Sequence, residues 1–109
     1  MITFKTLPEY YEFFEAIPEE KWCVDKFINE QGQMCAIGHL TGVYGDTFTR
    51  NHPIRSKLSI KATCKHYGRY SAARINNGAN EMADLGDTPK ERILNAITLI
   101  ESGILKDAK

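Results

Sequence analysis

Cys35 and His39 stand four residues apart in the segment MCAIGHLTG, residues 34–42, which has the pattern of a short helix. A thiol in the first turn of a helix lies at the positive end of the helix dipole, which lowers its pKa and increases the reactive thiolate. Cys35 could therefore serve a hydrolase or acyl transferase as nucleophile, with a histidine as base. Free cysteine is more often a small core residue. We favour packing for Cys35 and keep the cysteine-dependent enzyme, with His39 as its candidate base, as an alternative.

The chain contains thiols and imidazoles of the kind that zinc accepts. Four ligands could come from Cys35 and His39 together with Cys64 and either His66 or Cys23. No C-x-x-C pair occurs, however, and the spacings match no compact zinc finger. The sequence therefore predicts no metal and no cofactor.

Positive charge is concentrated in the middle of the chain. Residues 47–80 contain no acid and seven bases, whereas the whole chain has 14 bases, 14 acids and a net charge of zero. Residues 1–46 carry eight acids against three bases, and residues 81–109 carry six acids against four bases. A basic segment of this kind, with tyrosines between the charges, favours a phosphate-bearing or otherwise anionic ligand.

The candidate ligand-binding residues lie in or beside this basic segment, which we define as residues 50–74. They are Arg55, Lys57, Lys61, Lys65, Tyr67, Arg69, Tyr70, Arg74, Asn76 and Asn77. Zero net charge argues against general coating of nucleic acid, because that binding depends on excess positive charge. We therefore expect a nucleotide-like small anion or an acidic protein surface as the partner, with nucleic acid as a weaker option. Alternatively, these bases pair with the acidic first helix, within one chain or across a homo-oligomer.

The positions of these residues depend on a few predicted elements. Helical spacing and caps predict helices over 7–17, from 35 to about 42, and from 89 to about 102, with a hairpin over 22–34. Residues 56–68 alternate like a strand, but their length and terminal Gly68 favour a fourth helix. Residues 74–78, RINNG, read as a turn. Gly38 and Gly42 form a small-residue groove that we expect the final helix to fill.

The composition places the chain in a broad class. A length of 109 residues fits one domain, residues 1–109, and the expected fold is α+β, mainly α, with four helices and a short β-hairpin. No apolar run is long enough for a membrane span, and the first residues lack a signal-peptide pattern. Three cysteines in a chain of this size read as reduced thiols, so we expect a cytoplasmic protein.

Several short motifs resemble those of a family of small uncharacterised bacterial and phage proteins. Its members share a tryptophan, a glycine turn, a CALG-type helix start, an xIND turn and a final helix that opens TPxERhLxAL. The matches are Trp22, Gly32, CAIG at 35–38, RINNG at 74–78 and TPKERILNAI at 88–97, within residues 18–102. The resemblance implies a cytosolic, mostly helical domain, often phage-borne, and no established activity. Asn77 stands where the family has Asp, which weakens any role for a carboxylate there.

Charge, motifs and resemblance together lead to one functional hypothesis. We expect a non-enzymatic binding protein, phage-encoded and directed at a host or defence component, that engages an anionic ligand or an acidic partner through residues 50–74. It would act by sequestration or occlusion. The cysteine-dependent enzyme that uses Cys35 remains the first alternative, and a structural oligomer without a ligand is the second.

Overall fold

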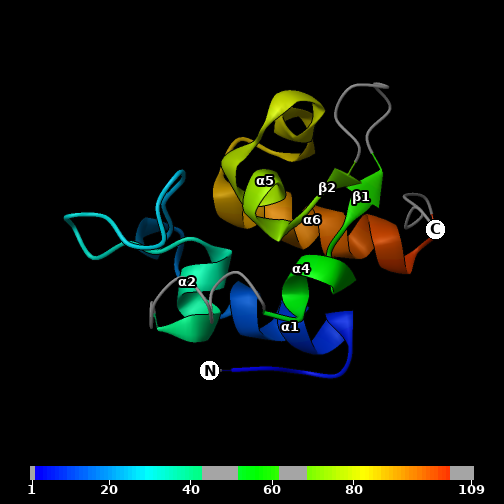
Figure 1. The fold of residues 1–109 in the computed structure, drawn as a ribbon, viewed down its shortest axis with the longest axis horizontal. Coiled ribbons are helices and arrows are strands. Elements are labelled where there is room, and N and C mark those ends of the chain that lie inside the picture. The colour runs from blue at the N-terminus through cyan, green and yellow to red at the C-terminus, as the bar shows by residue number, and fades with distance from the viewer. Residues whose placement is uncertain (1, 43–51, 62–68, 104–109) are drawn as a thin grey trace.

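The structure is a computed structural model that describes residues 2–42, 52–61 and 69–103 (Figure 1). The helices of these residues are α1 (Leu7–Glu15), η1 (Glu19–Lys21), α2 (Ala36–Thr41), α4 (Ile54–Lys57), α5 (Ala72–Asn77), η2 (Asn80–Leu85) and α6 (Pro89–Glu101). The strands are β1 (Ile60–Lys61) and β2 (Arg69–Tyr70), which pair antiparallel over two residues each. None of the helices in these ranges is long and apolar enough to cross a membrane.

The first and last helices form where the sequence predicts them. The Glu9 carboxylate accepts hydrogen bonds from the Thr6 N–H at 3.2 Å and the Thr6 hydroxyl at 2.9 Å, and Leu7 follows as the first residue of α1. The Thr88 hydroxyl accepts the N–H of Glu91 at 3.1 Å at the start of α6. Both caps satisfy groups that the helix itself leaves without partners. The caps and the apolar spacing are therefore sufficient to place α1 and α6.

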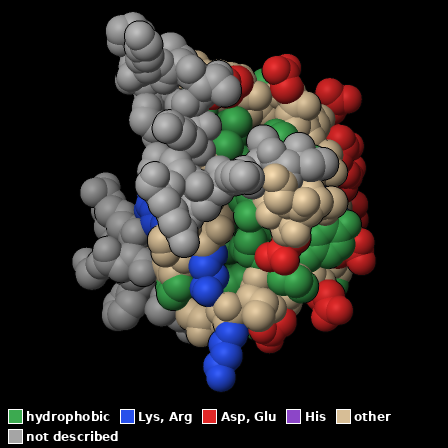
Figure 2. All heavy atoms as spheres, turned by 90° about the vertical axis from the view of Figure 1, so that its right-hand side faces the viewer, with side chains coloured by type: hydrophobic (Ala, Val, Ile, Leu, Met, Phe, Trp, Pro, Cys, Tyr) green, Lys and Arg blue, Asp and Glu red, His purple; other side chains and the backbone are tan. Residues whose placement is uncertain are grey.

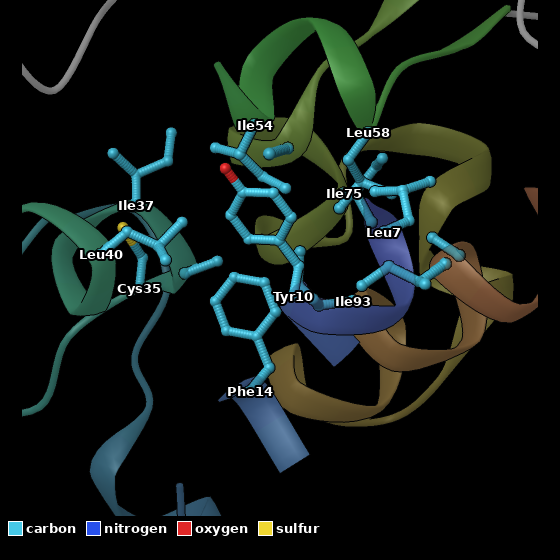
Figure 3. Packing of buried hydrophobic residues seen from close by; sticks show 14 of the residues in the cluster. Leu7, Tyr10, Phe14, Cys35, Ile37, Leu40, Ile54, Leu58, Ile75 and Ile93 are labelled. Atoms are coloured by element: carbon cyan, nitrogen blue, oxygen red, sulfur yellow. The ribbon is translucent and has the colours of Figure 1, made fainter. Parts of the chain in front are cut away.

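The core is a cluster of apolar side chains to which α1, α2, α4, α5 and α6 all contribute. Figure 3 shows the rings of Tyr10 and Phe14 at its centre, with α2 on one side. The side chains around the two rings include Leu7, Ile37, Leu40, Ile54, Leu58, Ile75 and Ile93. The Tyr10 hydroxyl also accepts the N–H of Phe4 at 3.1 Å. Complete burial of these two rings removes a large apolar area from water and makes them the centre of the core.

The predicted α+β fold with a hairpin over 22–34 is wrong, because the described chain is mainly helical and this segment forms a loop. Trp22 and Met34 pair in a parallel bridge and Ile28 and Met34 in an antiparallel one, but both bridges are isolated and no strand pair forms here. The Asn29 side chain accepts the N–H groups of Gln31 and Gln33 at 3.0 and 2.9 Å, which folds the loop on itself. The aromatic and β-branched residues of the segment therefore reflect burial of Trp22 more than strand pairing.

Residues 56–68 also depart from the helix that we favoured. The helical turn α4 ends at Lys57, and Ile60–Lys61 is extended against Arg69–Tyr70. Residues 62–68 lie outside the described residues. The alternation of apolar and polar residues at 58–61 thus indicated the strand at Ile60–Lys61 correctly, whereas the length of the segment did not.

The small-residue groove on α2 is filled by a different element from the one predicted. A Cβ added at Gly38 would collide with the carbonyl oxygen of Phe27 and come within 3.1 Å of the Met34 Cβ. Gly38 thus packs against the loop, whereas we expected the final helix there. Gly42 ends α2 with a φ of 65°, a conformation that glycine adopts without strain.

Candidate functional site

Asn76, a candidate ligand residue, is completely buried and has all its amide groups in use. Its Oδ1 accepts the N–H of Ala36 at 3.0 Å, which fixes the start of α2 on the end of α5. Its Nδ2 donates to the carbonyl of Cys23 at 3.0 Å and to Oδ1 of Asn77 at 3.1 Å. Asn76 is therefore the joint between the loop, α2 and α5, with no donor left for a ligand.

The final helix joins the same network through Arg92, a residue that the sequence analysis did not single out. The Arg92 side chain is 8% exposed, and its Nε and Nη2 donate to the carbonyl of Asn76 at 3.2 and 2.8 Å. Its Nη1 donates to the carbonyl of Gly86 at 3.1 Å. Burial lowers the pKa of Arg92, and the carboxylates of Glu91 and Asp87 oppose that shift. The Arg92 guanidinium thus donates to two backbone carbonyls, and its planar arrangement of N–H groups suits this geometry.

The motifs that suggested a family therefore meet in one place. Trp22 and Cys23, the CAIG segment, the RINNG segment and the arginine of TPKER are separated in the chain, yet hydrogen bonds through Asn76 connect them. Gly78, at the end of RINNG, has a φ of 69° and lies so close to Arg92 that an added Cβ would come within 3.0 Å of the guanidinium. The motif residues in this network therefore have a structural role, because their hydrogen bonds hold separate segments of the chain together.

A hollow of about 180 Å³ opens beside this network, which we call the Asp25 hollow. It is lined by Asp25, Lys26, Phe27, Cys35, Ala73 and Asn77. Asp25 has a φ of 63°, which costs a non-glycine residue energy, and its N–H donates to Oδ1 of Asn77 at 2.8 Å. The amide of Asn77 therefore holds the strained loop in place beside the hollow.

Cys35 and His39 are not arranged as a nucleophile and its base. The Sγ of Cys35 accepts the N–H of Gly38 at 3.4 Å, and burial raises the pKa of Cys35, which outweighs the lowering that we expected from the helix dipole. The His39 ring packs against Trp22 at a tilt of 59° with centroids 5.0 Å apart, and burial lowers the pKa of His39. Within the described residues, Nε2 of His39 has no hydrogen-bond partner.

The thiols and imidazoles considered as zinc ligands are only partly within the described chain. Cys64 and His66 lie outside it. Among residues 2–42, 52–61 and 69–103, no group of three or more His, Cys, Asp or Glu side chains is placed to hold a metal ion.

The basic segment contributes both surface and core residues. Lys57 and Arg74 are exposed and Arg55 is half-buried. In the part of the chain that the structure describes, none of these three makes an ion pair with a carboxylate. Tyr70, which we expected to stack on a ligand, is completely buried in the core.

The remaining candidates lie in or beside the part that the structure leaves out. The backbones of Lys61 and Arg69 pair across β1 and β2. Lys65 and Tyr67 lie outside the described residues. Of the basic side chains that the structure describes in this segment, Arg55, Lys57 and Arg74 are therefore the ones that could bind an anion.

Lys57 reaches a second and larger hollow, which we call the lysine hollow. It has a volume of about 450 Å³ at the start of α1 and is lined by Lys5, Thr6, Leu7, Pro8, Lys57 and Glu101. The Nζ of Lys57 donates to the carbonyl of Lys5 at 2.9 Å. Lys5 was missed from the sequence because it belongs to the acidic N-terminal third.

Figure 2 shows the face of the molecule at the right-hand side of Figure 1, where α6 ends. Acidic side chains gather along one edge of this face, while basic side chains lie toward its middle beside apolar ones.

Comparisons with known proteins add no further assignment. No protein-family model matches the chain, and no curated protein or solved structure matches it. The family resemblance carried by the short motifs stays a prediction, and the function has to be argued from the chemistry of the hollows.

Proposed function

We propose that this protein is a non-enzymatic binding protein that holds an anionic ligand at the lysine hollow and the adjoining basic segment. The observation that carries this proposal is the convergence of Lys5 and Lys57, 52 positions apart in the chain, on one hollow without an ion pair among the described residues. The motif resemblance supports a cytoplasmic, often phage-borne domain and implies no activity. Action on a host or defence component by sequestration is part of the proposal itself.

Two features of the lysine hollow suit an anion. Lys57 has further N–H donors on the ammonium that already bonds the Lys5 carbonyl. The start of α1 lies in the wall as well, where Thr6, Leu7 and Pro8 bring no charge of their own. The Glu9 carboxylate already caps this helix. Glu101 is the one acidic residue among the described residues that line the hollow, against the two basic residues Lys5 and Lys57. This balance favours a ligand with a compact anionic group such as a phosphate.

The test measures thermal unfolding of the full chain with inorganic phosphate, ATP and polyphosphate. A ligand at about 100 times its Kd adds about 2.7 kcal/mol to the free energy of unfolding, so a rise in Tm is expected. Lys57→Glu and Lys5→Glu should each abolish the rise, and Glu101→Gln should increase it. Lys21→Glu makes the same charge change at an exposed residue of η1 outside the hollow and should leave the rise intact.

The same series distinguishes the acidic protein partner that we considered. If poly-glutamate raises the Tm and the small anions do not, and Lys57→Glu removes the effect, the occupant is an acidic polypeptide surface. If no anion raises the Tm, or if Lys21→Glu abolishes the rise as completely as Lys57→Glu, the proposed function is wrong.

A further inference from the structure

Cys23 and Cys35 each follow one residue of a parallel bridge that joins two segments of the chain. The N–H of Met34 donates to the carbonyl of Lys21 at 2.9 Å, and the N–H of Cys23 donates to the carbonyl of Met34 at 3.1 Å. These two bonds place Trp22 opposite Met34 in a parallel bridge, and each cysteine follows its bridge residue by one position. Neighbouring parallel segments are about 4.8 Å apart at such a bridge, and a disulfide spans a Cα separation of about 4.4 to 6.8 Å. One step beyond the bridge, the Asn76 side chain lies between the Cys23 carbonyl and the Ala36 N–H.

The surroundings of the two sulfurs differ. The Cys23 thiol faces the carbonyls of Lys26 and Gln33 at 3.4 and 3.2 Å, to which a protonated thiol can donate. The Cys35 sulfur accepts the N–H of Gly38 and lines the Asp25 hollow, which gives a small reagent a route to it. Burial raises the pKa of Cys23, and Cys35 contributes to the shift as the next cause. A negative charge on Cys35 therefore makes the Cys23 thiol harder to deprotonate.

We propose that Cys23 and Cys35 are a redox-sensitive thiol pair that closes into a disulfide when the protein meets a small disulfide such as oxidised glutathione. Such reversible bonds are the usual role of disulfides in a reducing compartment, where they act in catalysis or sensing. The inference is independent of the anionic ligand, because neither cysteine lines the lysine hollow.

The reaction proceeds in two exchange steps. The Cys35 thiolate attacks one sulfur of oxidised glutathione, forms a mixed disulfide and releases one glutathione thiolate. The Cys23 thiolate then attacks the Cys35 sulfur, forms the Cys23–Cys35 bond and releases the second glutathione thiolate. The two protein thiol protons end on the two departing thiolates, so two protein thiols are oxidised and one glutathione disulfide is reduced.

Closure of this bond changes the Asp25 hollow. The Cys35 sulfur gives up the N–H of Gly38, and the chain between the cysteines, which includes the strained Asp25, becomes a closed loop. A closed loop has fewer unfolded conformations, so the oxidised protein should unfold at a higher urea concentration than the reduced protein.

Tryptic mapping tests the pairing directly, because each cysteine falls in its own peptide. Cys23 is in residues 22–26, Cys35 in 27–50 and Cys64 in 62–65. After the full chain is equilibrated with oxidised glutathione and alkylated, we expect the first two peptides to be joined and Cys64→Ser to leave this link unchanged. A link that involves Cys64, or glutathione adducts without a link, would overturn the proposal.

A second measurement separates the folded geometry from the short distance along the chain. The native protein should form the link at a ratio of reduced to oxidised glutathione at least roughly tenfold higher than the urea-unfolded protein does, since the fold raises the effective concentration of one thiol at the other. In Cys23→Ser, a mixed disulfide with glutathione should accumulate at Cys35. If the unfolded chain forms the link as readily as the native protein, the fold does not bring the thiols together and the proposal fails.

Discussion

Replacement of Asn76 by alanine should lower the free energy of unfolding far more than the small change in side-chain volume suggests. The side chain accepts the N–H of Ala36 at 3.0 Å and donates to the carbonyl of Cys23 at 3.0 Å, and Asn76 is completely buried. Asn76→Ala leaves both backbone groups without these partners. An unsatisfied buried polar group costs about 1 to 3 kcal/mol, so we expect the free energy of unfolding to fall by about 3 kcal/mol. That change lowers the folding equilibrium constant by roughly 100-fold.

The assay is urea unfolding followed by tryptophan fluorescence. Trp22 is the single tryptophan, is 4% exposed and sits in the segment that Asn76 anchors. A loss of about 3 kcal/mol should move the urea midpoint by on the order of 2 M and lower the Tm by roughly 12 °C or more. Asn95→Ala is the matched control. Its amide donates to the Leu85 carbonyl at 2.6 Å from an exposed position, and we expect a cost below about 1 kcal/mol.

Two results would refute this reasoning. If Asn76→Ala costs no more than Asn95→Ala, the amide is not the joint between the loop, α2 and α5. If Asn76→Ala instead keeps its stability and loses only the ligand-induced rise in Tm, the amide contacts a ligand, as the sequence first suggested, and the hydrogen-bond network described above is wrong.

Two further predictions concern α2. Burial lowers the pKa of His39 from 6.5, so the unfolded chain takes up a proton before the folded protein does, and the free energy of unfolding should decline as the pH falls below about 6.5. In urea titrations at roughly pH 7.5 and pH 5.5, His39→Gln should lose less stability than the wild type, and an equal loss would contradict the assigned burial. Gly38→Ala should lower the free energy of unfolding by about 1 to 3 kcal/mol because the new Cβ collides with the Phe27 carbonyl. An unchanged urea midpoint would show that the loop does not press on α2.

Local chemistry was sufficient to predict part of this molecule. Thr6 and Thr88, with a glutamate three residues after each, predicted the starts of α1 and α6, and Gly103 beyond α6 has the positive φ of 80° expected of a glycine at a helix end. These features depend on hydrogen bonds and dihedral preferences within a few residues, so the sequence shows them directly.

Other features depended on which segments meet. The loop over 22–34 has strand-forming residues, yet Asn76 holds it from 53 positions away through the Cys23 carbonyl. Tyr70 reads as a surface aromatic beside arginine and lies in the core. Periodicity and residue type do not predict such contacts. The free energy of these contacts is gained only when segments that are distant in the chain are already packed together.

The sequence by itself therefore determined the two long helices, their caps and the basic middle of the chain. The tertiary structure decided that Lys5 and Lys57 line one hollow and that the Arg92 side chain donates to the Asn76 carbonyl. It also decided that Cys35 is buried in the core, as we favoured, with its pKa raised by burial. The physical reason is desolvation. Burial sets the pKa of a thiol and the number of free donors on an amide, and only the packed chain determines which groups are buried.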